Sequence, residues 1–185
     1  DSPKLYYEHL SKGMTALGFV TSASDPCLFI HSTLKLMVLN YCDDQIWLSP
    51  DEALIEEYVT KLQNLGYDLT LESQGDIFGF LGINFHKEGS NIELTQKGLI
   101  SKIIKYTEMS GASDKPTPAT PEPLGSDKDG SPFHENWSYP AAVGMLLYVS
   151  SNTRPDIQFA VHQVARFSHN PKVSHGQAIK RIVRY

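Results

Sequence analysis

Residues 36–48 read LMVLNYCDDQIWL, which places two apolar runs, 36–39 and 46–48, on either side of the adjacent acids Asp43 and Asp44. Short apolar runs separated by a few polar residues are typical of paired strands, so the stretch predicts a β-hairpin with both acids at its tip. Neighbouring carboxylates raise each other's pKa unless a cation lies between them. The stretch therefore predicts a site for a divalent cation. The alternative is a solvent-exposed turn, because aspartate tolerates left-handed backbone.

The segments before this hairpin predict one helix and one further strand. Apolar residues recur at helical spacing over residues 4–17, and Gly18 supplies a stop signal. Residues 27–31 form a short β-compatible run that would pair with residues 36–39. The hairpin is therefore expected to belong to a larger antiparallel sheet.

The segments after the hairpin predict a helix followed by more strands. Ser49, Pro50 and Glu52 form a capping-box pattern, which predicts a helix that is capped by Ser49 and ends at Gly66. Further strands are predicted at residues 67–71 and 78–85, and a turn at 88–91 leads into a short return strand. This order predicts an α+β fold with helices on one face of a largely antiparallel sheet.

The second half of the chain predicts helices. A helix carrying Leu99 and Ile104 is followed by a loop rich in Pro, Ser, Asp and Gly, at about residues 111–132. Three helical segments come next, at residues 139–150 and after starts that resemble capping boxes at Thr153 and Ser174.

The amino-acid composition is typical of a globular protein with a hydrophobic core. The 185 residues include 41% hydrophobic residues, enough for a substantial core, and no stretch approaches the roughly 20 apolar residues that span a bilayer. The two cysteines, Cys27 and Cys42, are expected to be free thiols, and the seven histidines show no zinc-site spacing with them. Since the chain starts at Asp1 and ends in a helical pattern at Tyr185, we expect it to be an internal piece of a larger, soluble protein.

Two helix faces could contact a phosphate backbone despite the net charge of −5. One face carries Lys102 and Lys105, and the other carries Lys180, Arg181 and Arg184. The alternative is that both faces are simply solvated, as most charged helix faces are.

Six segments, taken together in their order and spacing, resemble the reverse transcriptase of Ty1/copia-type retrotransposons. They are residues 41–44, 80–83, 94–97, 139–147, 153–157 and 181–185. The resemblance implies a right-hand polymerase. Residues 1–90 would form a partial palm subdomain with a primer-grip-like hairpin, and residues 91–185 would form the thumb and the start of the connection.

The resemblance also implies roles for individual residues. Asp43 would bind the metal directly with Asp44 as an auxiliary ligand, for two Mg²⁺ ions or Mn²⁺ in their place. Tyr41 and Cys42 would lie beside the incoming nucleotide and the primer end, or else only pack as strand residues. The primer grip would comprise Phe80, Leu81, Gly82 and Ile83, although the glycines alone would equally fit a β-bulge.

Two positions depart from the family pattern. Cys42 stands where valine is common, which is a mild change, and Gln45 stands where an aliphatic residue is usual, which puts activity in some doubt. The family's first catalytic aspartate and the fingers lie upstream of residue 1. The chain is therefore expected to be inactive by itself.

The implied partners are an RNA or DNA template-primer, deoxynucleoside triphosphates, and the rest of the retroelement polyprotein, including upstream fingers and a downstream RNase H. No membrane partner is expected. The implied location is a cytoplasmic retroelement particle, with a nuclear step. The alternative is a non-catalytic remnant that either binds primer-template nucleic acid or is only a folded relic.

Overall fold

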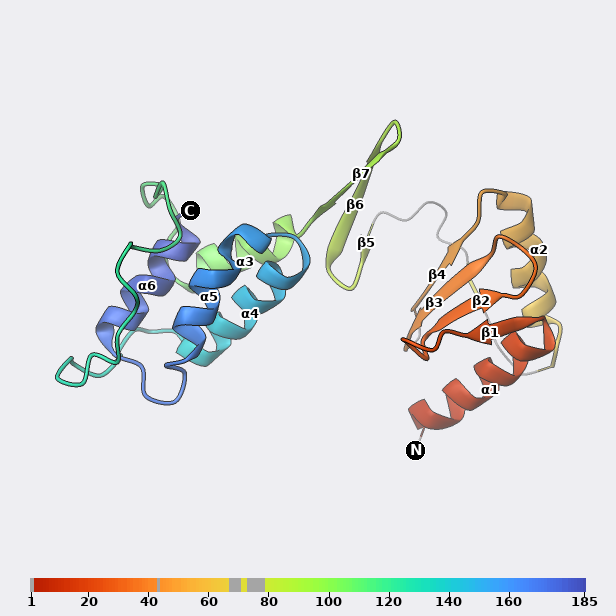
Figure 1. Cartoon of the computed structure of the whole chain (residues 1–185), viewed down its shortest axis with the longest axis horizontal. Coiled ribbons are helices and arrows are strands. Elements are labelled where there is room, and N and C mark those ends of the chain that lie inside the picture. Colours follow the sequence, from red (N-terminus) through yellow and green to blue (C-terminus); the bar gives the residue numbers. More distant parts are fainter. Residues whose placement is uncertain (1, 43, 67–70, 73–78) are drawn as a thin grey trace. The chain divides into compact units, whose positions relative to one another are not determined.

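The computed structural model describes residues 2–42, 44–66, 71–72 and 79–185. The chain forms two compact units, residues 1–77 and 78–185 (Figure 1). None of the helices in these described ranges is long and apolar enough to cross a membrane.

The first unit contains a four-stranded antiparallel sheet. Its strands follow the chain order β1, β2, β3 and β4, and each pairs with the next. The bounds are β1 Phe19–Thr21, β2 Leu28–His31, β3 Met37–Tyr41 and β4 Asp44–Leu48. The predicted pairing of residues 27–31 with 36–39 is confirmed, because Leu28 lies opposite Leu39 and Ile30 opposite Met37.

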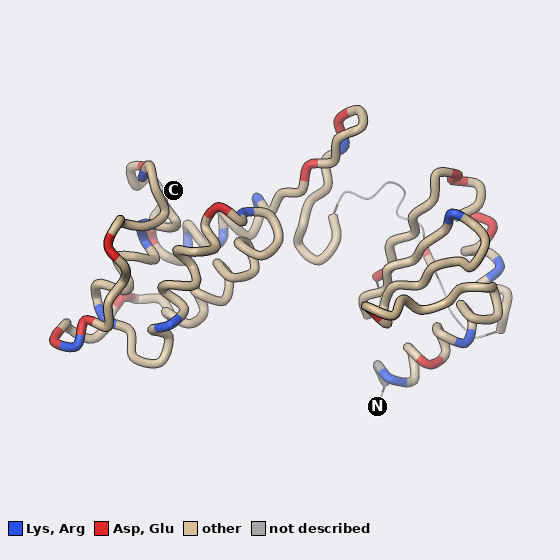
Figure 2. Tube along the Cα trace, viewed as in Figure 1, with Lys and Arg blue, Asp and Glu red and all other residues tan. Residues whose placement is uncertain are grey.

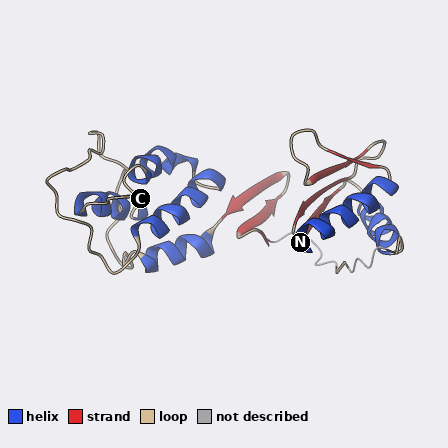
Figure 3. Cartoon of the chain, turned by 90° about the horizontal axis from the view of Figure 1, so that it is seen from below, coloured by secondary structure: helices blue, strands red, loops and turns tan. Residues whose placement is uncertain are grey.

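Two helices cover one face of this sheet, α1 Ser2–Ala16 and α2 Glu52–Gln63 (Figures 1 and 3). The core between helices and strands is made of fully or almost fully buried side chains: Leu10, Met14, Phe19, Phe29, Leu36, Val38 and Leu62. Burial of one such side chain stabilises a fold by about 1.5–3 kcal/mol. The prediction of an antiparallel sheet with helices on one face is confirmed for this unit.

The start of α2 differs from the prediction. Asp51, and not Ser49, is the N-cap: its side chain accepts a hydrogen bond from the Ala53 amide, and the helix begins at Glu52. Ser49 instead accepts a hydrogen bond from the amide of Asp51. Aspartate at the N-cap, followed by Glu52 in the first turn, places two acids at the positive end of the helix dipole.

The second unit begins with a three-stranded antiparallel sheet formed by β5 Gly79–Phe80, β6 Ile83–Glu88 and β7 Asn91–Thr95. The single strand predicted at residues 78–85 is wrong, because a two-residue turn at Leu81 and Gly82 divides it. Both turn residues have positive φ, +53° and +77°, as a tight hairpin turn requires. The return strand is confirmed as β7. Phe78 and most of the strand predicted at residues 67–71 lie outside the described residues.

Helices form the rest of the second unit: α3 Lys97–Tyr106, α4 Tyr139–Asn152, the 3₁₀ turn η1 Pro155–Ile157, α5 Gln158–Ala165 and α6 Val173–Val183. Their shared core includes Ile103, Leu146, Ile157, Val161 and Ile179. The predicted helical second half is confirmed. Neither predicted cap is right, because the N-caps before η1 and α6 are Arg154 and Lys172. The Thr153 hydroxyl donates instead to Gln96 Oε1, 2.8 Å away.

Candidate functional site

Strands β3 and β4 form the predicted hairpin, and Asp44 is the first residue of β4. Tyr41 and Asp44 lie opposite each other as the last residue of β3 and the first of β4, so residues 42 and 43 connect the strands. Cys42 has a φ of +51°, a left-handed backbone conformation that β-branched residues rarely adopt. Asp43, the expected direct metal ligand, lies outside the described residues. We call the connection with its two flanking residues the β3–β4 turn.

The side chains of Tyr41 and Asp44 lie on the face of the sheet opposite the helices. Directly paired strand residues share a face, and side chains alternate along a strand. Val38 and Asn40 are buried toward the helices, so Tyr41 and Asp44 belong to the other, outer face, where both are exposed. This outer face also carries Val20, Leu28, Ile30, Met37, Leu39, Ile46 and Leu48.

A polar network supports the turn from the helix side. The Gln45 amide nitrogen donates to Asn40 Oδ1 at 3.3 Å, and Trp47 Nε1 donates to Gln45 Oε1 at 3.0 Å. The glutamine that departs from the family pattern therefore has partners for both atoms of its amide. Asn40 and Trp47 were not singled out from the sequence, although a buried asparagine in an apolar run is a usable signal.

The chemistry available at the turn is that of carboxylates and thiols. Asp44 forms no ion pair with any described residue. Burial raises the pKa of the nearby Cys27 thiol, and the negative charge of Asp25 raises it further. Cys27 and Cys42 are free cysteines, as expected. The residues that the structure describes include no cluster of three or more His, Cys, Asp or Glu side chains that could hold a metal ion.

The predicted primer-grip residues form the β5–β6 turn in the second unit. Phe80 pairs with Ile83 across the turn, and Leu81 and Gly82 are exposed at its tip. The hydroxyl of Tyr148 on α4 donates to the carbonyl oxygen of Leu81 at 2.5 Å, which ties the turn to the helices. Because residues 79–80 and 83–84 pair in regular register, the β-bulge alternative is wrong.

The predicted cationic residues fall into two groups. Lys102 and Lys105 are exposed on α3. Figure 2 marks the Lys and Arg residues along the described chain in blue and the Asp and Glu residues in red. The three cations at the C-terminal end of α6, with Arg184 as the C-cap, instead bind the long loop before α4. Lys180 pairs with Glu135 at 2.6 Å, Arg181 donates to both oxygens of Thr117, and Arg184 donates to both oxygens of Ser113. These contacts fasten the loop to α6. Contact of either group with a phosphate backbone stays a prediction.

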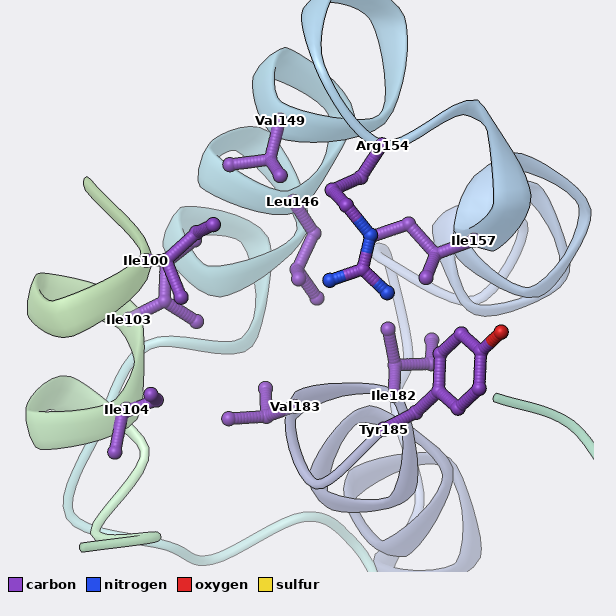
Figure 4. Close-up of a pocket in the computed structure, with 10 residues that line it drawn as sticks. All are labelled: Ile100, Ile103, Ile104, Leu146, Val149, Arg154, Ile157, Ile182, Val183 and Tyr185. Atoms are coloured by element: carbon purple, nitrogen blue, oxygen red, sulfur yellow. The ribbon is translucent and has the colours of Figure 1, made fainter. Parts of the chain in front are cut away.

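A small cavity lies between α3, α4 and α6 (Figure 4). Its volume of about 50 Å³ is far below the several hundred Å³ of typical ligand pockets, and mainly isoleucine, leucine and valine side chains line it. Arg154 also lines it, bound to both carboxylate oxygens of Asp156 and facing the ring of Tyr185. The hydrogen bonds from Arg154 lower the pKa of Asp156. This arrangement closes the helix core and leaves no room for a nucleotide.

Comparison with known proteins finds one matching family, described as Reverse transcriptase (RNA-dependent DNA polymerase), over residues 1–121. Along its whole length the chain is 33% identical to a retrovirus-related Pol polyprotein from transposon RE1 of Arabidopsis thaliana, of which it spans 12%. It is 27% identical to the Pol polyprotein from transposon TNT 1-94 of Nicotiana tabacum, of which it spans 14%. A putative transposon Ty5-1 protein of Saccharomyces cerevisiae is 25% identical, and the chain spans 60% of it. No solved structure matches.

Proposed function

Since the chain belongs to the reverse transcriptase (RNA-dependent DNA polymerase) family and its relatives are Ty1/copia-type Pol polyproteins, we propose that the β3–β4 turn is part of a nucleotidyl-transfer centre. The parent protein would synthesise DNA from deoxynucleoside triphosphates on an RNA or DNA template. The observation that carries this proposal is the placement of Tyr41 and Asp44 opposite each other on the outer face of a tight hairpin, flanking residues 42 and 43.

The donor chemistry at the turn fits divalent cations. Hard cations such as Mg²⁺ take carboxylate oxygens, and Asp44 is exposed without an ion-pair partner among the described residues. We assign Asp43 as the direct ligand and Asp44 as the auxiliary one. Two bound Mg²⁺ ions, or Mn²⁺, would stabilise the attacking and leaving oxygens of an in-line displacement at phosphorus. A further carboxylate from elsewhere in the longer polyprotein completes the proposed set.

The residues around the acids would position the substrates. Tyr41 is 53% exposed, so its ring is free to contact the incoming nucleotide or the primer end beside Cys42. The Asn40–Gln45–Trp47 network links the two strands next to the turn and so limits its movement. Such support matters because a displacement of about 1 Å can reduce a rate about 100-fold.

The remaining elements fit a palm followed by a thumb and the start of a connection. The helix-covered sheet of the first unit supports the palm assignment. The β5–β6 turn would grip the primer through Phe80, Leu81, Gly82 and Ile83, and its tip is exposed yet tied to α4. Lys102 and Lys105 would contact the phosphate backbone. The proposed partners in the polyprotein are upstream fingers and a downstream RNase H, within a cytoplasmic retroelement particle that has a nuclear step.

Primer extension by a polyprotein that includes this chain and its upstream segment tests the proposal. Asp43→Asn and Asp44→Asn remove one negative charge each and should reduce extension about 100-fold or more, with the larger loss at Asp43. Asp51→Asn is the matched control, because asparagine also caps helices well and the position serves only α2. Full extension by the Asp43→Asn protein would disprove the metal assignment. The 185-residue chain alone is expected to show no extension.

A further inference from the structure

A basic pocket lies in the second unit, between the long loop and the turn that joins α5 to α6. Its volume is about 340 Å³, within the range of small-ligand sites. Its polar lining comes from Ser126, Lys128, Arg166, His169, Asn170 and Lys172. Three basic side chains from two distant parts of the sequence, Lys128, Arg166 and Lys172, therefore line one concave space.

The wall of the pocket is fixed by His175, which is completely buried. Its Nδ1 faces the amide of Lys172 at 3.0 Å and must accept that hydrogen bond, so Nε2 carries the proton and donates to the carbonyl of Gly125 at 2.9 Å. The imidazole also stacks on Phe167, with ring centroids 4.1 Å apart. One buried side chain thus connects the loop, the end of α5 and the start of α6.

Further contacts hold the loop on both sides of Lys128. Before it, the hydroxyl of Ser174 donates to the carboxylate of Asp127. After it, residues 131–133 pair with residues 171–173: the Phe133 amide donates to Pro171 and the Val173 amide donates to Ser131, both at 3.0 Å. The loop that presents Lys128 is therefore held in place by the fold.

The described residues pair none of the basic side chains of the pocket with a carboxylate. Across the part of the chain that the structure describes, no ion pair involves Lys128, Arg166 or Lys172. Arg166 donates to the neutral Gln163, and the carboxylate of Asp127, which precedes Lys128 in the chain, accepts a hydrogen bond from the hydroxyl of Ser174. Uncompensated cations that line a concave surface attract anions and concentrate them there.

We propose that this pocket binds a phosphate group, with Arg166 as a bidentate donor and Lys128 and Lys172 as additional positive charges. A guanidinium matches the geometry of phosphate oxygens, and an ammonium serves as a point charge. Ser126 and Asn170 supply neutral donors. The phosphate can come from a nucleic-acid strand or from free phosphate. The site lies in the second unit and its residues take no part in the proposed metal chemistry, so the two proposals can fail separately.

Nuclear magnetic resonance of the 185-residue chain tests this proposal at constant ionic strength, first with inorganic phosphate and then with an oligothymidylate. Phosphate is expected to shift the amide resonances of residues 126–128 and 166–172 selectively. The double variant Arg166→Gln/Lys172→Gln should bind about tenfold more weakly or worse, since two charged hydrogen-bond donors are lost. The backbone amide of Lys172 that binds His175 remains in this variant.

The matched control is Lys12→Gln/Lys35→Gln, which removes the same net charge from exposed positions in the first unit. This control should bind phosphate like the unchanged chain. Equal binding by Arg166→Gln/Lys172→Gln, or the absence of selective shifts, would overturn the proposal. Tighter binding of the oligothymidylate, in competition with phosphate, identifies a nucleic-acid backbone as the source. Saturation by phosphate alone identifies the free ion.

Discussion

The β3–β4 turn and the α6 helix both carry charged residues that the sequence singles out, but they use them differently. Asp44 at the turn is exposed and forms no ion pair with a described residue, whereas Lys180, Arg181 and Arg184 on α6 all bind the loop before α4. Charged residues that bind another part of the fold and charged residues that do not can have the same residue type and the same spacing in the sequence. Only the partners decide whether a charge supports the fold or remains available to a ligand.

Loss of the Lys180 side chain should have the largest effect on the free energy of unfolding. Lys180→Met leaves Glu135 mostly buried without its partner, because the Glu135 side chain is only 24% exposed. We expect the free energy of unfolding to fall by about 2 kcal/mol, measured by urea denaturation. Lys105→Met on the exposed face of α3 is the control and should change it by less than about 0.5 kcal/mol. Equal effects would show that the Lys180–Glu135 pair does not stabilise the fold.

The left-handed backbone conformation of Cys42 should limit which residues are tolerated at this position. Cys42→Val places a β-branched residue at a φ of +51°, so we expect a loss of about 1 kcal/mol or more in the free energy of unfolding. Cys42→Gly should instead be neutral or stabilising, because glycine adopts positive φ freely. Thermal and urea denaturation of both variants would measure the difference. A valine variant as stable as the unchanged chain would contradict the described turn.

Asp156, unlike Asp44, forms an ion pair with a described residue, Arg154, so its contribution to the stability of the fold should depend on pH. Arg154 lowers its pKa in the folded state, so its contribution is present above the unfolded value near 3.8 and is lost as the pH falls through the lower folded value. Because the pair is partly exposed, we expect Asp156→Asn to cost only about 0.5 kcal/mol at pH 6 and almost nothing near pH 2. Denaturation of both proteins across this range gives the measurement; a cost independent of pH would argue against the ion pair.

Neutralising Asp44 should have the smallest effect on stability. Asp44→Asn removes an exposed charge that no described residue pairs, so we expect a change of less than about 0.5 kcal/mol, with a slight gain from reduced repulsion of the neighbouring acid. Urea denaturation at low and high salt would detect it. A loss above 1 kcal/mol would mean that Asp44 stabilises the fold, as the cations of α6 are expected to do.

The local pattern of the sequence predicted the hairpin, the first helix and the helical second half correctly, because alternation and helical spacing are short-range features. The errors occurred where one or two residues shift an element. The sequence pattern predicts Ser49 as the cap that Asp51 provides, and it predicts a continuous strand where Leu81 and Gly82 form a turn. The local sequence often allows two neighbouring residues to cap a helix, or one segment to form either a strand or a turn. Tertiary contacts decide which alternative forms.

Most of the contacts that define the candidate sites could not be predicted from the sequence. Tyr148 binds the carbonyl of Leu81 across 67 positions, and Arg184 binds Ser113 across 71. His175 also contacts Gly125, 50 positions away. No periodic pattern encodes such pairs. The sequence therefore indicated which residues carry charge but could not tell which of them the fold neutralises.

The outer face of the first sheet has a practical consequence for handling the chain in solution. Val20 is 56% exposed, and it continues across the paired strands into the exposed Ile30, Met37 and Leu48. A continuous apolar row of this kind, on the face of the sheet opposite the described helices of its own unit, promotes self-association. We expect purified chain to aggregate as its concentration rises, and polar substitutions at Val20 and Met37 to improve its solubility.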